Sequence, residues 1–324
     1  MAAKRDKLNF GQRVGYYLLL GVCKLIGYLP YCVLYYVLAP FVYFVCYRVL
    51  GYRRKVVRDN LLAAFPEKSA EQRLVIEKRF YRLLAENMVD VIDMTSMSPR
   101  ELKKRMRVEN MEQTDSEIGT NNWIAALAHY GEWEYFSVYA IDHHYPNIGV
   151  YHPLSNKVMD HFMLYIRRRF GMEVAPMNSL ARPVMRNLKS RTQMALGLIA
   201  DQRPRWAESD KKWRTFLNQP TLFFGGIGSY AKKFGMMVYT LDIEKVKPSH
   251  FKCRFIQLYD GKEDISEEAI MDRYVACIEE MIRRRPEMWL WSHRRWKHKP
   301  KPEQLTATVG RQEEKSANKE NAQN

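Results

Sequence analysis

The longest apolar stretch of the chain lies near its N-terminus. Residues 25–47 contain no charged side chain, and this is long enough to cross the hydrocarbon core of a bilayer, about 30 Å thick. Pro30 and Pro40 interrupt the stretch, and basic residues flank it on both sides, so charge alone gives no orientation. We therefore expect residues 1–52 to form an apolar helical membrane anchor, either one span or a re-entrant or interfacial helix pair.

A second pattern, of helical period, lies between Pro66 and Pro99. Basic residues surround an apolar stripe made of Leu74, Phe80, Leu84, Met88 and Val91. The spacing predicts an amphipathic helix within a connector formed by residues 53–110. A basic amphipathic helix after an anchor suits anionic lipid headgroups, and it suits packing on a catalytic domain equally well.

After residue 115 the pattern alternates between strands and helices. Apolar runs predict strands at 123–128, 147–151, 194–200 and 236–241, and an edge strand at 251–258. Helices are predicted at 155–170, 225–235 and 266–285, each ended by glycine or proline. This order predicts an α/β catalytic domain over residues 111–298, with helices on both faces of its sheet. The polar residues 299–324 predict a disordered tail.

Composition and charge narrow the class of protein. The chain has 324 residues, of which 47% are hydrophobic, so it can bury a sizeable core and is not generally disordered. Its net charge of +16 implies an anionic partner. With no zinc-finger spacing and no RNA-binding aromatic motif, we expect an anionic membrane surface and no nucleic acid. The five cysteines form no CxxC motif and are expected to be reduced, as in a protein that faces the cytosol.

The candidate chemistry centres on His129, which follows the predicted strand at 123–128. Gly131 comes next, and apolar residues then recur at helical spacing from Trp133. Glu134 lies five positions after His129, so the two meet only if the histidine is in the turn and the glutamate on the helix. There the carboxylate would fix the imidazole tautomer while His129 acts as a general base. The alternative is a core histidine beside a surface glutamate.

Several kinds of catalytic site are not indicated by the sequence. There is no GxSxG nucleophile motif, no phosphate-binding loop and no dinucleotide glycine fingerprint, and the histidine motif is not the HExxH of zinc proteases. We therefore expect no metal and no cofactor. A general base without a protein nucleophile suits direct transfer from an activated acyl donor, such as a thioester, to a substrate hydroxyl.

Six blocks occur in an order that resembles one enzyme family. They are AHYGEWE at 128–134, VYHPLSN at 150–156, the arginine-glycine stretch 167–171, ADQ at 200–202, FLNQPTLFFGG at 216–226 and PEMWLWSHRRWK at 286–297. The first looks like the HX4(D/E) motif of membrane acyltransferases. Together, over roughly residues 10–298, the blocks resemble the lipid A late acyltransferases of Gram-negative bacteria, in the form of the Bacteroidetes branch.

This resemblance implies a glycerol-phosphate-acyltransferase-like fold at the inner membrane, with the catalytic domain facing the cytoplasm. The activity implied is transfer of a fatty acyl chain from acyl carrier protein, as co-substrate, to a hydroxyl of a lipid A precursor. His129 would be the base and Glu134 its partner. Arginines would bind the acceptor's phosphates, Asp201 would position one of them, and glycines would offer backbone N–H groups to an anion. The substrate-binding candidates are Arg167, Arg169, Asp201, Arg203, Gly225, Gly226, His293 and Arg294.

Two other functions stay open from the residues. One is an acyltransferase that acts on another lipid acceptor, such as a lysophospholipid, an amino-lipid or a pigment. The other is a non-enzymatic basic protein that binds membrane surfaces. Under the enzyme interpretation, a basic cluster is the candidate dock for the acidic carrier protein, and it comprises Arg294, Arg295, Lys297 and Lys299. The neighbouring tryptophans at 289, 291 and 296 are interpreted as core residues.

Overall fold

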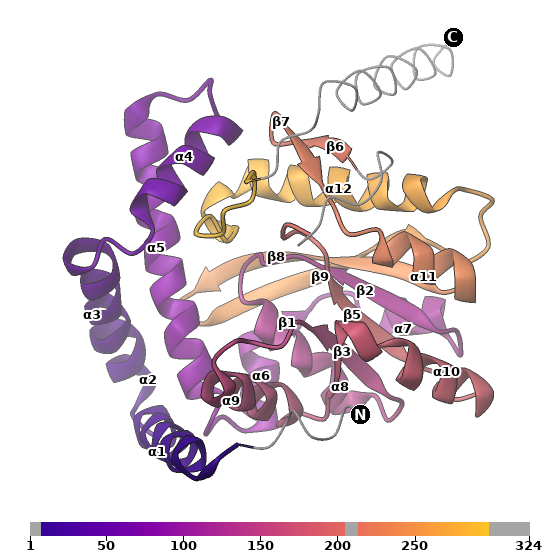
Figure 1. The fold of residues 1–324 in the computed structure, drawn as a ribbon, viewed down its shortest axis with the longest axis horizontal. Helices are drawn as coiled ribbons and strands as arrows, with labels where there is room; N and C mark the ends of the chain where they lie inside the picture. Colours follow the sequence, from indigo (N-terminus) through magenta and orange to yellow (C-terminus); the bar gives the residue numbers. More distant parts are fainter. Residues whose placement is uncertain (1–7, 205–212, 298–324) are drawn as a thin grey trace.

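A seven-stranded sheet forms the centre of the computed structural model, in the order β1-β9-β8-β2-β5-β3-β4 (Figure 1). The structure describes residues 8–204 and 213–297, so the predicted tail at 299–324 lies outside the described residues. Neighbouring strands are parallel, except that β8 and β9 form an antiparallel pair. The strands are β1 (Met106–Val108), β2 (Trp123–Leu127), β3 (Asn147–Tyr151), β4 (Glu173–Pro176), β5 (Ala195–Ile199), β8 (Met237–Lys247) and β9 (His250–Tyr259).

Helices cover the sheet, and the predicted α/β class is confirmed. Asn156 caps the first turn of α9, Ser266 caps α12, and Gly235 ends α11 in the left-handed conformation. A small hairpin, β6 (Trp213–Phe216) and β7 (Gln219–Leu222), packs beside α12. The helices of this part are α6 (Pro99–Arg105), α7 (Met111–Ile118), η4 (Trp133–Val138), α8 (Tyr139–Asp142), α9 (Lys157–Arg168), η5 (Met177–Ser179), α10 (Ala181–Lys189), α11 (Gly226–Phe234), α12 (Glu267–Arg284) and η7 (Pro286–Met288).

The prediction of an edge strand at 251–258 was correct only for its second half. Strand β9 forms there, but β1 pairs with it in parallel, from Met106 opposite Phe251 to Val108 opposite Cys253. The first part of β9 is therefore covered on both sides. A strand of three residues such as β1 is too short to produce a recognisable alternation of apolar and polar positions.

The N-terminal apolar stretch forms two helical segments rather than one. Helix α1 (Phe10–Gly27) ends before Pro30, and a second helix runs over Tyr31–Val49. The second helix has 19 residues and a mean hydropathy of 1.6, so by length and composition it is apolar enough to cross a membrane. It consists of α2 (Tyr31–Val33), η2 (Leu34–Leu38), α3 (Ala39–Tyr43) and η3 (Phe44–Val49), with π-helical turns in η2 and η3.

The predicted connector contains α4 (Arg54–Ala64) and the long helix α5 (Ala70–Asp93). The helix was expected, but its apolar stripe was placed wrongly, because Leu74 and Met88 are 36% and 47% exposed. Helix α5 packs between α3 and the segment at η7, so it buries side chains on more than one face. One buried cluster extends from α4 and α5 into the sheet. The division at residues 52, 110 and 298 stays a prediction.

Candidate active site

A cavity of about 670 Å³ lies where β2, β3 and β5 end. Its wall includes Leu127, Tyr151 and Ile199, the last residues of those three strands. Loops that follow parallel strands gather at this edge, which is where α/β sheets commonly bind ligands. Five of the residues singled out in the sequence line this cavity together: His129, Glu134, Arg167, Arg203 and His293.

The turn that carries His129 is held by backbone hydrogen bonds to the C-terminal segment of the domain. The N–H of Leu290 donates to the carbonyl oxygen of His129 at 3.0 Å, and the N–H of Gly131 donates to Met288 at 2.8 Å. Gly131 has φ +61°, and a Cβ there would lie 2.9 Å from Cγ2 of Ile243. The turn therefore requires glycine at this position, both for its conformation and for its packing.

The imidazole of His129 is hydrogen-bonded to Asp201. The distance from Nδ1 of His129 to Oδ1 of Asp201 is 2.8 Å, and the backbone N–H of His129 donates to Oδ2 at 3.0 Å. The indole N–H of Trp289 donates to the same Oδ2 at 2.8 Å. Burial alone would raise the pKa of Asp201, but the charge of His129 and these hydrogen bonds more than offset it and lower the pKa. Asp201 is thus an ionised carboxylate that orients the ring.

This pairing differs from the sequence-based assignment, which gave Glu134 to the imidazole and Asp201 to an arginine. Glu134 accepts two hydrogen bonds from Arg167, Nε to Oε2 at 2.9 Å and Nη2 to Oε1 at 2.5 Å. Burial would raise the pKa of Glu134, but Arg167, with a smaller contribution from His129, lowers it. The indole N–H of Trp133 also donates to Glu134 at 3.2 Å, and its ring lies edge-on to the His129 ring, 5.0 Å between centroids. Glu134 therefore pairs with Arg167 and contacts Trp133, and its interaction with His129 is electrostatic.

The signal that identifies Asp201 is strand register. Strands β2 and β5 are adjacent and parallel, and Leu127 lies opposite Ile199. His129 and Asp201 each follow two residues after that paired position, so the register brings their side chains to the same edge of the sheet. No pattern in the sequence identified the hydrogen bond from Trp289 to Asp201. Trp289 was predicted to be a core residue, and it does pack in the core, where it is 3% exposed.

The remaining cavity candidates differ in charge. Arg203 lines the cavity as a cation. His293 also lines it, but burial and then the charge of Arg295 lower the pKa of His293 to about 4. At neutral pH its ring is therefore uncharged and cannot act as a cationic phosphate ligand. Among residues 8–204 and 213–297, no group of three or more His, Cys, Asp or Glu side chains is arranged to hold a metal ion.

Five of the eight predicted binding residues do not line the cavity: Asp201 and Arg294, which are described separately, and Arg169, Gly225 and Gly226. Arg169 donates to the backbone oxygens of Met94 at 2.9 Å and Met97 at 2.7 Å, so it fastens α9 to the end of α5. Gly225 and Gly226 form the N-terminus of α11, directly after Phe224, which does line the cavity. The geometry thus gives Arg169 a structural contact in place of the predicted phosphate contact.

The predicted basic cluster at 294–299 is divided by the fold. Arg295 is 2% exposed, donates to the carbonyl oxygen of Leu222 at 2.7 Å, and stacks on the Phe223 ring at 4.6 Å. It therefore cannot belong to a surface dock. Arg294 is exposed, and Lys299 lies outside the described residues.

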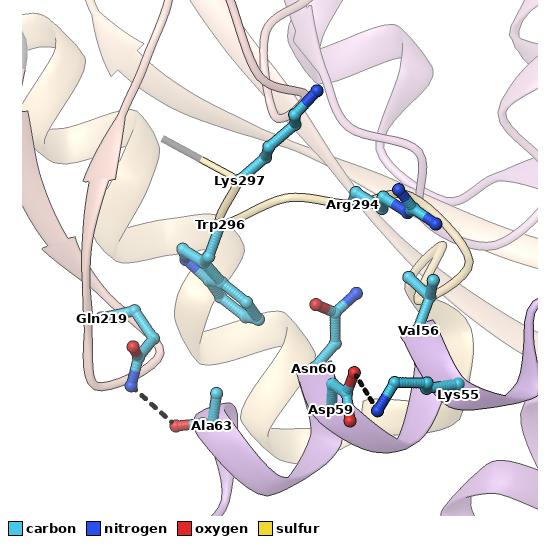
Figure 2. Close-up of a pocket in the computed structure, with 9 residues that line it drawn as sticks. All are labelled: Lys55, Val56, Asp59, Asn60, Ala63, Gln219, Arg294, Trp296 and Lys297. Carbon is cyan, nitrogen blue, oxygen red and sulfur yellow. Dashed lines mark hydrogen bonds and ion pairs between the residues drawn. The ribbon is translucent and has the colours of Figure 1, made fainter. Parts of the chain in front are cut away.

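Arg294 lines a separate groove of about 410 Å³, together with Lys55, Lys297 and Trp296 (Figure 2). The groove lies between α4 and the C-terminal segment. Asn60 joins the two, because its amide nitrogen donates to the carbonyl oxygens of residues 291 and 293, both at 2.8 Å. The segment that borders the groove through Arg294 thus borders the active-site cavity through His293.

The fold places a histidine, hydrogen-bonded to a buried carboxylate, in a cavity at the edge of an α/β sheet, and the family of the chain makes it an acyltransferase. A family model described as bacterial lipid A biosynthesis acyltransferase matches residues 1–298. The chain belongs to this membrane-associated family, and the resemblance found in the sequence is confirmed. No protein of curated function matches the chain.

Proposed function

We propose that the protein transfers a fatty acyl chain from an acyl carrier protein thioester to a hydroxyl of a lipid A precursor. The observation that carries the proposal is the pair formed by His129 and Asp201 in the cavity of a lipid A acyltransferase family member. The inner membrane, with the catalytic domain on the cytoplasmic side, is the location that suits a cytoplasmic carrier and a membrane lipid.

The proposed reaction uses His129 first as a base and then as an acid. Because Nδ1–H donates to Asp201, Nε2 is the nitrogen that accepts the proton of the acceptor hydroxyl. The hydroxyl oxygen attacks the thioester carbonyl carbon and forms the new C–O bond. When the tetrahedral intermediate collapses, the C–S bond breaks, and the imidazolium returns its proton to the thiolate. Asp201 stabilises the imidazolium between these steps.

The lining of the cavity suits an anionic lipid. Arg203 contributes a cation, while an apolar wall suits acyl chains and comprises Phe136, Met163, Met172, Ile199 and Leu290. The adjoining groove around Lys55, Arg294 and Lys297 suits the acidic surface of a carrier protein, since it is basic and borders the same C-terminal segment as the cavity (Figure 2).

The test is an acylation assay with purified full-length protein, acyl carrier protein thioester and lipid A precursor. We expect His129→Ala to lower the rate by about 10²–10⁴-fold, the usual contribution of a general base. His144→Ala, a change of an exposed histidine, is the matched control. Full activity of folded His129→Ala would remove the enzyme proposal, and faster turnover with acyl-CoA would remove the carrier donor. Mass spectrometry of the product identifies the acylated hydroxyl, and preferred acylation of another lipid would replace the acceptor.

A further inference from the structure

The N-terminal helices carry a large exposed apolar surface. On α1 and on the helix at Tyr31–Val49, eleven large apolar or tyrosine side chains are each at least 44% exposed. They are Phe10, Val14, Tyr17, Leu18, Val22, Leu25, Tyr36, Val37, Phe41, Phe44 and Val49. An apolar surface of this extent is typical of a protein or membrane interface.

The opposite face of the Tyr31–Val49 helix packs against the catalytic domain and meets polar groups. The hydroxyl oxygen of Tyr35 lies 2.6 Å from Asp90 and 3.0 Å from Asp93, so its one proton is shared between two carboxyl groups that are buried on α5. The guanidinium of Arg105 lies 5.3 Å from the Tyr35 ring. Lipid chains cannot form hydrogen bonds with such groups, so this face of the helix must stay packed against the rest of the protein.

Both ends of the same helix are also fastened to the domain. At its start, the Tyr31 hydroxyl donates to the carbonyl oxygen of Pro248, in the turn between β8 and β9, at 2.8 Å. Just beyond its end, Nη1 of Arg53 donates to the carbonyl oxygen of Ser292 at 3.0 Å. Nineteen helical residues extend about 29 Å, close to the thickness of the hydrocarbon core. A helix crossing the bilayer would place Pro248 and Ser292 on opposite sides of it, although both belong to one packed domain.

We infer that α1 and the Tyr31–Val49 helix lie in the plane of one leaflet and do not cross the membrane. Their exposed apolar side chains would enter the boundary between headgroups and acyl chains, and the domain would rest on that surface. Arg13 and Arg48 are exposed on these two helices, where cations favour anionic headgroups. The sequence left a single span and a re-entrant or interfacial helix pair as alternatives, and this arrangement is the interfacial helix pair.

The in-plane arrangement also places the cavity next to the lipid surface. Helix α1 packs against α9, and a Cβ at Gly15 would lie 3.9 Å from Cγ2 of Val158. Helix α9 in turn supplies Asp160, Met163 and Arg167 to the cavity wall. A lipid acceptor would reach His129 without leaving the membrane surface. This last step rests on the proposed function, whereas the in-plane placement does not.

The decisive experiment maps which positions face the periplasm. Full-length protein carrying Ala2→Cys and Tyr28→Cys is expressed in cells whose outer membrane is permeable, and a thiol reagent that cannot cross the inner membrane is added. Peptide mass spectrometry then reads each labelled cysteine. We expect no label at either position until the inner membrane is opened. Label at residue 2 alone would indicate that only α1 spans, label at residue 28 alone that both helices span, and label at both that only the Tyr31–Val49 helix spans. Each of these results overturns the inference.

A second measurement tests whether the exposed face binds lipid. Val37→Asp combined with Phe41→Asp changes two exposed positions, 62% and 60%, so the fold should be unaffected. We expect binding to protein-free phosphatidylethanolamine–phosphatidylglycerol vesicles to weaken by about 10- to 100-fold, the scale of burying two such side chains. Met185→Asp, a 43% exposed position on α10, is the control and should bind normally. Unchanged binding of the double variant would overturn the assignment of this face to lipid, whatever the enzymatic activity.

Discussion

Two pairs of carboxyl groups lie on opposite sides of the turn at residues 129–134, and their pKa values are shifted in opposite directions. On the cavity side, Asp201 and Glu134 have lowered pKa values because His129 and Arg167 bind them. On the other side, Glu132 is 1% exposed and Asp90 is fully buried. Burial raises the pKa of both groups, and the charge of Asp90 adds to the effect on Glu132. Two glutamates only two residues apart thus have pKa values shifted in opposite directions, lowered for Glu134 beside Arg167 and raised for Glu132 in the core.

The hydrogen-bond partners of these carboxyl groups explain why their pKa values shift in opposite directions. Asp90 accepts hydrogen bonds from the hydroxyls of Tyr35 at 2.6 Å and Tyr135 at 3.0 Å, which are neutral donors. Tyr135 belongs to η4, the helix that carries Glu134, and Tyr35 belongs to the Tyr31–Val49 helix. Asp90 therefore fastens the turn at residues 129–134 to α5 and to the Tyr31–Val49 helix. On the cavity side, Asp201 and Glu134 instead bind His129 and Arg167.

The largest expected effect within this comparison is that of Asp201→Asn. The amide keeps the shape of the side chain but cannot stabilise an imidazolium, and its NH₂ group favours the wrong imidazole tautomer. We expect kcat to fall by about 10²–10⁴-fold with little change in KM, by analogy with carboxylates that orient a catalytic histidine. Steady-state kinetics measures this. Asp242→Asn removes a carboxylate that pairs with Arg284 outside the cavity, so it should stay near full activity. A folded Asp201→Asn protein within a few-fold of wild type would show that the observed contact is not catalytic.

A smaller effect is expected from the Glu134–Arg167 pair, whose side chains are 7% and 25% exposed. Glu134→Gln and Arg167→Met should each lower kcat by about 10- to 100-fold, less than loss of the base itself. Each should also lower the free energy of unfolding by up to about 3–5 kcal/mol, because one buried charge is left unpaired. The double variant removes both charges and should recover part of that stability, as a double-mutant cycle would measure.

The same cycle distinguishes the two assignments of Glu134. If Glu134 orients the imidazole directly, as the sequence suggested, Glu134→Gln should match His129→Ala in activity while Arg167→Met stays nearly active. If Glu134 acts through Arg167 and Trp133, the two single variants should resemble each other. Thermal unfolding supplies a readout that is independent of catalysis.

The sequence revealed the parts of this protein that depend on local pattern. Central strands such as β2 are buried at every position and therefore appear as continuous apolar runs. His129 was identifiable because it follows such a run. The bond from His129 to Asp201 joins residues 72 positions apart and depends on the register of β2 with β5, which no local pattern encodes.

Burial of charged residues was equally hidden. Arg295 occurs in a run of basic residues, which normally indicates a solvated surface. Its side chain is nevertheless buried, where it donates to the carbonyl oxygen of Leu222 and stacks on the Phe223 ring. The stripe on α5 was misplaced for a similar reason, because Asp90 is buried against tyrosines from two other helices. Contacts with residues distant in the sequence determine whether such side chains are buried, and a single sequence does not reveal those contacts.

The smallest effect on activity is expected for Glu132→Gln, because glutamine resembles the protonated side chain that burial favours. Activity at neutral pH should stay within about 3-fold of wild type, whereas stability should change with pH. The folded pKa of Glu132 is raised, so above the unfolded pKa the unfolded chain releases a proton that the folded chain keeps. Rising pH therefore destabilises the wild type, by up to about 1.4 kcal/mol per pH unit, until the folded pKa is reached.

Glutamine cannot titrate, so the free energy of unfolding of Glu132→Gln minus that of wild type should increase as pH rises through this window. Urea unfolding at a series of pH values from 4 to 8 measures the difference. Glu263 is the control of opposite sign, since its hydrogen bonds with Arg273 lower its pKa. Any stability that Glu263 contributes is lost as pH falls through its lowered pKa, so Glu263→Gln should show no gain at high pH. A pH-independent difference for Glu132→Gln would mean that Glu132 is ionised in the folded protein, and the contrast between the two sides of the turn would disappear.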